Sequence, residues 1–192
     1  MSKERIFAAA KSLLEREGVS GLSVRKVAQR AGVSPMAMYN HFADKNALLN
    51  ALIEDGFAAW EKIVRNIRAQ DAMVWLERLM DAFVDFALTE PHRFDAAFFL
   101  PATQARKYPD DFIRGRSPVV AMMMVRIDQA KVEGRLTNKP ALEVALALAA
   151  MGQGFVSMHR AGRFASDKQF KTLYRVAIEH CLDSFKAAEN RP

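Results

Sequence analysis

The 192-residue sequence predicts an all-α fold, with a short three-helix unit at the N-terminus followed by a larger helical part. Two observations lead to this prediction. Apolar residues recur at the three- and four-residue spacing of amphipathic helices, and no long stretch alternates with the two-residue period of a half-buried strand. Serine, proline and glycine, which typically begin or end helices, stand at the ends of these periodic stretches.

The first two helices are short, and each has a clear end. The first carries apolar residues at helical spacing from Ile6 to Leu14. It is predicted to end at Gly18, because glycine readily adopts the left-handed conformation that closes a helix. Ser23 is a good N-cap for the second helix, and Gly32 is predicted to end it.

A third helix is predicted directly after the second. Ser34 is its N-cap, and Pro35 takes the first helical position, where a missing backbone N–H costs no hydrogen bond. Only Gly32 and Val33 separate the second helix from this cap. Two helices joined by so tight a turn, with a glycine in it, have the spacing of a helix-turn-helix.

The rest of the chain is predicted to form longer helices. Asp44 is expected to cap a fourth helix that runs to about Arg68. The segment 101–116 contains two prolines and mixed charges, and is predicted to be a loop or connector. Five further helices are expected at 71–89, 91–100, 117–133, 139–161 and 167–188.

Positive charge is concentrated at the N-terminal end. The whole chain carries a formal net charge of +6, and residues 1–50 hold eight Lys or Arg against four Asp or Glu, a net +4. A basic N-terminal unit favours a polyanionic partner such as nucleic acid, although a solvated basic surface has the same composition. Charge alone leaves both alternatives open.

Cysteine usage and hydropathy favour the reducing cytoplasm. Cys181 is the only cysteine, so no disulfide can form within the chain, and the charged N-terminus has no signal-peptide pattern. The most apolar run, 141–156, includes Glu143 and two glycines. It is shorter than the roughly 20 apolar residues that cross a bilayer, and is predicted to be a buried helix. We therefore expect a cytoplasmic protein without a membrane partner.

The stretch LSVRKVAQRAGVSPMAMYNHFADKNALL, residues 22–49, resembles the N-terminal signature of the tetracycline-repressor (TetR) family of bacterial transcriptional regulators. The matching features are the serine-capped second helix, the Ala-Gly-Val-Ser turn at 31–34, Tyr39, the His-Phe pair at 41–42, and Lys45. The resemblance implies a helix-turn-helix DNA-binding domain at 1–48 and a helical regulatory and dimerisation domain at 49–192.

The resemblance and helix geometry together predict the DNA contacts. The third helix is expected to enter the major groove with Met36, Ala37 and Asn40 toward the base edges. Tyr39 and His41 are expected to donate hydrogen bonds to phosphates. The full set of predicted DNA-binding residues is Ser23, Arg25, Lys26, Ser34, Pro35, Met36, Ala37, Tyr39, Asn40, His41 and Lys45.

Several of these residues also have a purely structural interpretation. The Tyr39 ring alternatively packs against the first helix, and Arg25 and Lys26 are alternatively solvated charges. Ala37 departs from the family, which often has a threonine or serine here whose hydroxyl meets a phosphate. Direct base reading is therefore expected to be sparse, with more of the specificity coming from DNA shape.

The resemblance further implies a homodimer on double-stranded operator DNA and a small-molecule effector, apolar or amphipathic, that releases a repressor from its operator. The helices at 139–161 and 167–188 are expected to pair with their mates, because two copies place two recognition helices along a pseudo-palindrome. For the aromatic and methionine residues of the C-terminal part, plain core is the alternative to a ligand pocket. The pocket candidates are Trp75, Phe83, Phe98, Met122, Met123, Arg126, Phe155 and His159.

An all-α enzyme with an apolar pocket is the alternative function. The sequence contains no GxSxG, HExxH, Walker, GxGxxG or CxxC motif, and its four histidines are scattered. Tyr39 and His41 cannot act as a pair on one helix face, because residues two apart point about 200° from each other. We therefore expect no catalytic residue, no metal and no cofactor.

Overall fold

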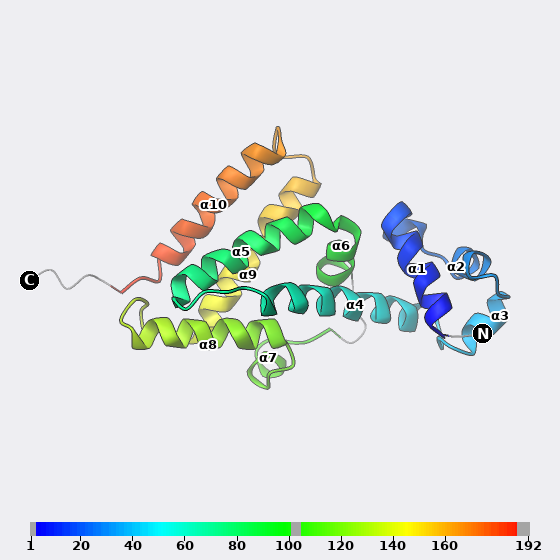
Figure 1. The fold of residues 1–192 in the computed structure, drawn as a ribbon, viewed down its shortest axis with the longest axis horizontal. Coiled ribbons are helices and arrows are strands. Elements are labelled where there is room, and N and C mark those ends of the chain that lie inside the picture. The colour runs from blue at the N-terminus through cyan, green and yellow to red at the C-terminus, as the bar shows by residue number, and fades with distance from the viewer. Residues whose placement is uncertain (1–2, 101–104, 188–192) are drawn as a thin grey trace, which may run out of the picture. The chain divides into compact units, whose positions relative to one another are not determined.

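The computed structural model describes residues 3–100 and 105–187, and within these ranges the all-α prediction is confirmed (Figure 1). The described elements are α1 (Lys3–Glu17), the 3₁₀ turn η1 (Val19–Gly21), α2 (Val24–Ala31), α3 (Pro35–Tyr39), α4 (Lys45–Arg65), α5 (Ala72–Thr89), α6 (Pro91–Phe99), α7 (Asp110–Ile113), α8 (Pro118–Val132), α9 (Ala141–Arg160) and α10 (Asp167–Asp183).

The predicted helix starts are confirmed by their hydrogen bonds. Ser23 Oγ accepts from the Lys26 backbone N–H at 3.2 Å at the start of α2, and Ser34 Oγ accepts from that of Ala37 at 3.1 Å at the start of α3. Asp44 does the same for α4 through Ala47, at 2.7 Å. Each cap satisfies a backbone donor that the helix itself leaves unpaired.

Some boundaries differ from the sequence prediction. The fourth helix ends at Arg65 rather than about Arg68, and the last ends at Asp183 rather than 188. Beyond α10 the backbone instead pairs with the segment after α8, where the Thr137 N–H donates to the Phe185 carbonyl at 2.7 Å. The predicted loop at 101–116 contains the short helix α7, while residues 101–104 of that prediction lie outside the described residues.

The chain divides into two compact units, one made of Met1–Trp60 with Thr89–Ala105 and the other of Glu61–Leu88 with Arg106–Pro192. The boundary predicted at 48/49 falls within α4.

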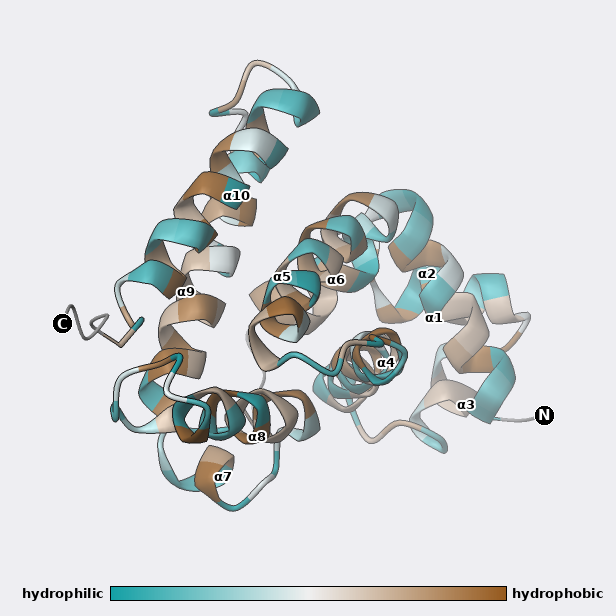
Figure 2. Ribbon diagram, turned by 60° about the vertical axis from the view of Figure 1, so that its left-hand side comes forward, coloured by the Kyte–Doolittle hydropathy of each residue, from teal (hydrophilic) through white to brown (hydrophobic). Residues whose placement is uncertain are grey.

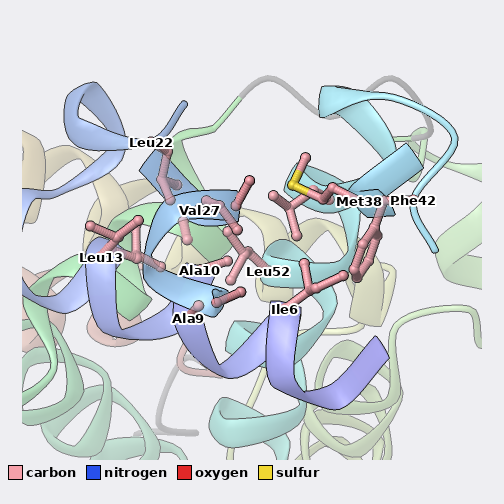
Figure 3. Close-up of a cluster of buried hydrophobic side chains, with 14 residues drawn as sticks. Ile6, Ala9, Ala10, Leu13, Leu22, Val27, Met38, Phe42 and Leu52 are labelled. Carbon is pink, nitrogen blue, oxygen red and sulfur yellow. The ribbon is translucent and has the colours of Figure 1, made fainter. Parts of the chain in front are cut away.

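The first unit is built around an apolar core, and each of its longer helices contributes side chains to this core. Figure 3 shows side chains of α1, α2, α3 and α4 converging on one cluster, which fixes the short helices of the basic N-terminal segment against each other. Its labelled members are Ile6, Ala9, Ala10, Leu13, Leu22, Val27, Met38, Phe42 and Leu52.

A half-buried carboxylate on α4 joins three helices of the first unit. Asp55 accepts from Lys11 Nζ of α1 at 2.8 Å and from Arg93 Nε of α6 at 3.1 Å. Beside it, Gly56 allows α4 and α6 to approach closely, because an added Cβ would lie 2.9 Å from the Arg93 carbonyl oxygen and 2.9 Å from the Ala97 Cβ. Ion pairs therefore hold α1 and α6 to α4, and close packing at Gly56 holds α4 and α6 together.

In the second unit α10 is fastened to α5, and α9 lies beside both α8 and α10 (Figure 1). The buried Tyr174 hydroxyl donates to the Met80 carbonyl at 2.9 Å. Outside this buried bond, Arg175 pairs with Asp81 at 2.9 Å and Lys171 with Asp85 at 2.8 Å. The two helices thus share one buried hydrogen bond flanked by exposed ion pairs.

Helix α9 is buried along one side only, so the prediction of a buried helix at 141–156 is wrong for its other side. Residues such as Val144, Leu148 and Val156 are buried, whereas Leu146 and Met158 are exposed. Helix α9 is long and apolar enough to cross a membrane, and Figure 2 shows the hydropathy along it. A third of its most apolar 18 residues is buried, and a single helix of this kind is weak evidence for a membrane span. Its hydropathy reflects a second apolar face that the described chain leaves uncovered.

Candidate nucleic-acid interface

The turn between α2 and α3 has the geometry that the sequence predicts. Gly32 adopts the left-handed conformation (φ 65°, ψ 40°) that closes α2, and the next backbone N–H, of Val33, donates back to the Ala28 carbonyl at 2.9 Å. The Arg5 guanidinium lies over this turn, since a Cβ added to Gly32 would be 2.9 Å from its Nη2. The turn sets α3 at a fixed angle to α2, as a helix-turn-helix requires.

Helix α3 has one buried and one exposed side, as predicted. Met38 is fully buried and the following Phe42 nearly so, whereas Met36 is 75% exposed. Asn40 is exposed and Ala37 is half-buried. The exposed side is small and largely apolar, with Asn40 as its one amide.

The three predicted phosphate contacts around the end of α3 differ in exposure. Tyr39 is 46% exposed, so its side chain is not fully buried in the core of the first unit. His41 is half-buried, and Lys45 is exposed as the first residue of α4. The Asp44 side chain accepts from the Ala47 N–H, and the other N–H groups in the first turn of α4 have no partner within the helix. These N–H groups and the Lys45 ammonium together favour an anion such as a phosphate.

The basic residues of α2 have different partners. Lys26 Nζ pairs with Glu17 Oε2 at 2.6 Å, and the hydrogen bond from this lysine lowers the pKa of the Glu17 carboxyl below its ordinary value. Arg30 Nη2 donates to the neutral Ser12 Oγ at 2.7 Å. Arg25 is exposed and makes no ion pair with the described residues.

Sequence reasoning missed three residues that the structure adds to this neighbourhood. Glu17 neutralises Lys26, Arg5 lies over the Gly32 turn, and the Lys3 Nζ lies 5.4 Å from the centre of the Phe42 ring. Glu17 and Lys26 are nine positions apart and belong to different helices. Helical periodicity relates only positions within one helix, so it does not reveal such a pair.

The pocket candidates fall into separate neighbourhoods. Phe98 lies in the first unit, with its ring centre 5.5 Å from that of Phe57. In the second unit the Arg126 guanidinium lies over the Trp75 ring at 5.5 Å and donates to Gln129 at 3.0 Å. Trp75, Phe83 and Met123 are buried and Met122 is half-buried.

Phe155 and His159 belong to a cluster of aromatic rings formed by α9, α10 and the loop between them. The His159 ring meets Phe170 edge-on with centres 4.3 Å apart, and its Nε2 lies 3.0 Å from Asp167 Oδ1. The centres of the Phe155 and Phe164 rings are 6.0 Å apart.

Within the part of the chain that the structure describes, no three His, Cys, Asp or Glu side chains gather as metal ligands would.

Two family models match the chain. The model "Bacterial regulatory proteins, tetR family" matches residues 6–52, and "Tetracyclin repressor-like, C-terminal domain" matches residues 76–181. The first covers the helix-turn-helix, and the second covers more than half of the chain.

Individual proteins agree with these matches. The tetracycline repressor protein class A from transposon 1721 of Escherichia coli is 51% identical over 49 residues, which are 26% of this chain and 23% of that repressor. The chain thus matches about a quarter of that relative's length.

Two solved structures share the fold over nearly the whole chain. A Rhodococcus sp. RHA1 protein of unknown function has a TM-score of 0.75 at 24% identity, covering 95% of this chain and 94% of that one. A TetR variant from Acinetobacter baumannii in complex with minocycline has a TM-score of 0.69 at 22% identity, covering 96% of each chain.

Proposed function

The chain belongs to the tetR family of bacterial regulatory proteins, and on that premise we propose that it is a dimeric transcriptional repressor that a small molecule releases from its operator. The observation that carries the proposal is the exposed side of α3. A small apolar surface with one amide projects from a rigid helix-turn-helix, and basic residues flank it. This is the arrangement that reads a major groove.

Residues 1–48 form the DNA-binding domain in this proposal. Met36 and Ala37 contact thymine methyl groups, and Asn40 bonds a base edge or the backbone. Ser23, Arg25, Tyr39, His41 and Lys45 contact phosphates, and Ser34 and Pro35 hold the start of α3 against the groove. Residues 49–192 regulate and dimerise.

The dimer interface in this proposal is the apolar stripe, which we define as Leu146, Ala150, Gly154 and Met158 on α9 and Leu173 and Val176 on α10. All six are exposed. Gly154 supports the proposal in particular, because a Cβ added there would meet nothing within 4 Å. A glycine inside a helix costs about 0.5–1 kcal/mol relative to alanine. The folded single chain does not require it, whereas a closely approaching second α9 would.

Gly152 provides the comparison within the same helix. A Cβ there would lie 3.0 Å from Met80 Cε and 3.2 Å from a Phe83 ring carbon, so Gly152 serves packing inside the chain.

The apolar stripe can contact the same stripe of a second copy across a two-fold axis. Such a two-fold symmetric pair also matches the symmetry of a pseudo-palindromic operator.

The effector in this proposal is apolar or amphipathic and binds in the second unit. The aromatic and methionine candidates that belong to the second unit, Trp75, Phe83, Met122, Met123 and Phe155, supply the apolar surface, and Arg126 and His159 supply polar contacts. Minocycline is bound by the Acinetobacter baumannii relative, and we propose only the same broad class of ligand here. The ligand acts by favouring the state whose recognition helices do not fit the operator.

A selection of duplexes from a random-sequence pool tests the proposal. The full-length protein should enrich a pseudo-palindromic site whose half-sites are centred about 34–36 Å apart, or a multiple of that distance, and shift it in a gel at moderate salt. Enrichment of no sequence above a scrambled duplex, at both low and moderate salt, contradicts DNA-specific regulation.

A further inference from the structure

The Glu17–Lys26 pair places an acidic group inside the proposed DNA interface. Lys26 lies in the first turn of α2, and its backbone N–H donates to the Ser23 cap. Its ammonium would be well placed for a phosphate, yet Glu17 Oε2 of α1 holds it at 2.6 Å. We propose that Glu17 limits the affinity of this interface for DNA by occupying Lys26, an inference that rests on the DNA binding proposed above.

Local packing holds the Glu17 side chain in this position. A Cβ added to Gly21 would lie 2.3 Å from the Glu17 Cβ and 2.9 Å from its Oε2. The Glu17 side chain therefore lies across the face of Gly21, in space that any other residue at position 21 would fill. The glycine in η1 makes room for the carboxylate next to α2.

The other basic residues of α2 form no ion pair with the described residues. Arg30 donates to a serine hydroxyl, and its charge acts on the Glu17 carboxyl without a direct contact, as a smaller cause of the lowered pKa than Lys26. Arg25 makes no ion pair there. Within that part of the chain, Lys26 alone among the three is neutralised by a carboxylate. The charge of the proposed phosphate-binding side of α2 is thereby reduced by one.

The strength of the pair decides how it acts. Both side chains are about half exposed, and exposed ion pairs contribute little to stability, so a phosphate can displace Glu17 from Lys26. Breaking the pair uses up part of the binding free energy that the contact between Lys26 and the phosphate would supply. Glu17 therefore weakens DNA binding without strongly stabilising the fold.

The test compares Glu17→Gln with Glu15→Gln in the full-length protein. Glu15 is an exposed residue of the same helix, two positions away and so on a different face, and its substitution changes the net charge equally. Binding to the selected operator, and to a scrambled duplex, is measured between 50 and 200 mM salt. Thermal unfolding of each variant checks the fold.

We expect Glu17→Gln to bind both duplexes about fivefold tighter than Glu15→Gln at 50 mM salt. The slope of log affinity against log salt should steepen by about 0.9, the value of one phosphate contact, so that the advantage shrinks about three- to fourfold by 200 mM. In a Lys26→Gln background the gain from Glu17→Gln should disappear.

Three results are unfavourable, and they have different meanings. Equal affinity and slope for the two glutamine variants, or weaker binding by Glu17→Gln, overturns this inference while the proposed function stands. Persistence of the gain in the Lys26→Gln background overturns the role of Lys26. Failure of the wild-type protein to bind either duplex at any salt overturns the proposed function and this inference together.

Discussion

Met36 and Met38 are identical side chains in opposite surroundings. A helix turns about 100° per residue, so positions two apart point away from each other. Met38 is fully buried in the core of the first unit, and Met36 is 75% exposed at the centre of the proposed base-reading surface. An exposed methionine adds nothing to the stability of the free protein, so its contribution is expected in the complex.

Substituting each methionine with alanine should separate these roles. Met38→Ala removes a fully buried side chain and should lower the free energy of unfolding by about 2–5 kcal/mol. Met36→Ala should leave unfolding within about 0.5 kcal/mol of wild type and weaken operator binding. Chemical denaturation and a gel-shift titration measure the two effects, and a stability loss in Met36→Ala equal to that of Met38→Ala would contradict the assignment of faces.

Arg25→Ala and Lys45→Ala should each weaken DNA binding, because each removes a proposed phosphate contact. The salt dependence should flatten by about 0.9 in log–log slope for each variant, and the loss should be similar for operator and scrambled duplexes. Lys62→Ala, an exposed lysine of α4 outside the interface, is the control. A slope equal to that of Lys62→Ala would place the residue among the solvated charges.

Tyr174 links stability to alkaline pH. Burial, with a smaller contribution from Asp81, raises the pKa of its phenol well above the ordinary value. The folded protein thus keeps this proton when an unfolded tyrosine, with a pKa of about 10, has lost it. Stability from this group is present below pH 10 and lost as pH rises beyond it.

Tyr174→Phe should therefore lower the free energy of unfolding by about 1 kcal/mol at neutral pH, because the bond to the Met80 carbonyl is lost. The difference from wild type should shrink above pH 10. Denaturation at pH 7 and at pH 10.5 measures it, and a difference that stays constant or grows with pH would show that the phenol is not protected from ionisation.

At the scale of helices, residues that cap them could be predicted from the sequence and long-range partners could not. Ser23, Ser34 and Asp44 each accept from a backbone N–H three positions away, so short-range patterns reveal them. The end of α10 depends on the backbone pairing of residues 185–187 with the distant segment 135–137. Hydropathy also does not distinguish an apolar face that meets the core from one that meets solvent, so the sequence alone does not reveal the exposed side of α9.

The crossing of α4 and α6 depends on the absence of a side chain at Gly56. Gly56→Ala improves helix propensity but drives a methyl group against the Arg93 carbonyl and Ala97. We expect a net loss of about 1 kcal/mol or more in unfolding free energy, because overpacking costs more than propensity returns. Ala58→Gly, at an exposed position of the same helix, measures the propensity effect alone. Stabilisation by Gly56→Ala would show that the two helices have room to separate.

At the scale of the whole molecule, the uncovered apolar stripe on α9 and α10 predicts association. Val176→Asp places a charge within the stripe on α10, and burying it in a dimer is unfavourable. Sedimentation at micromolar concentration should show a dimer for wild type and a monomer for this variant. Val132→Asp is the matched control, because Val132 is 91% exposed on α8 and outside the stripe. A dimer that survives Val176→Asp but not Val132→Asp would place the interface elsewhere.

The apolar stripe also shapes how a cell would respond to the amount of this protein. If only the paired form holds the operator, mass action makes the concentration of that form follow the square of the chain concentration wherever single chains predominate. Halving gene dosage would then reduce the DNA-binding species about fourfold rather than twofold. Under the proposed function, pairing through this face of two helices would give the regulated promoter a threshold, set by expression level, below which repression decreases steeply.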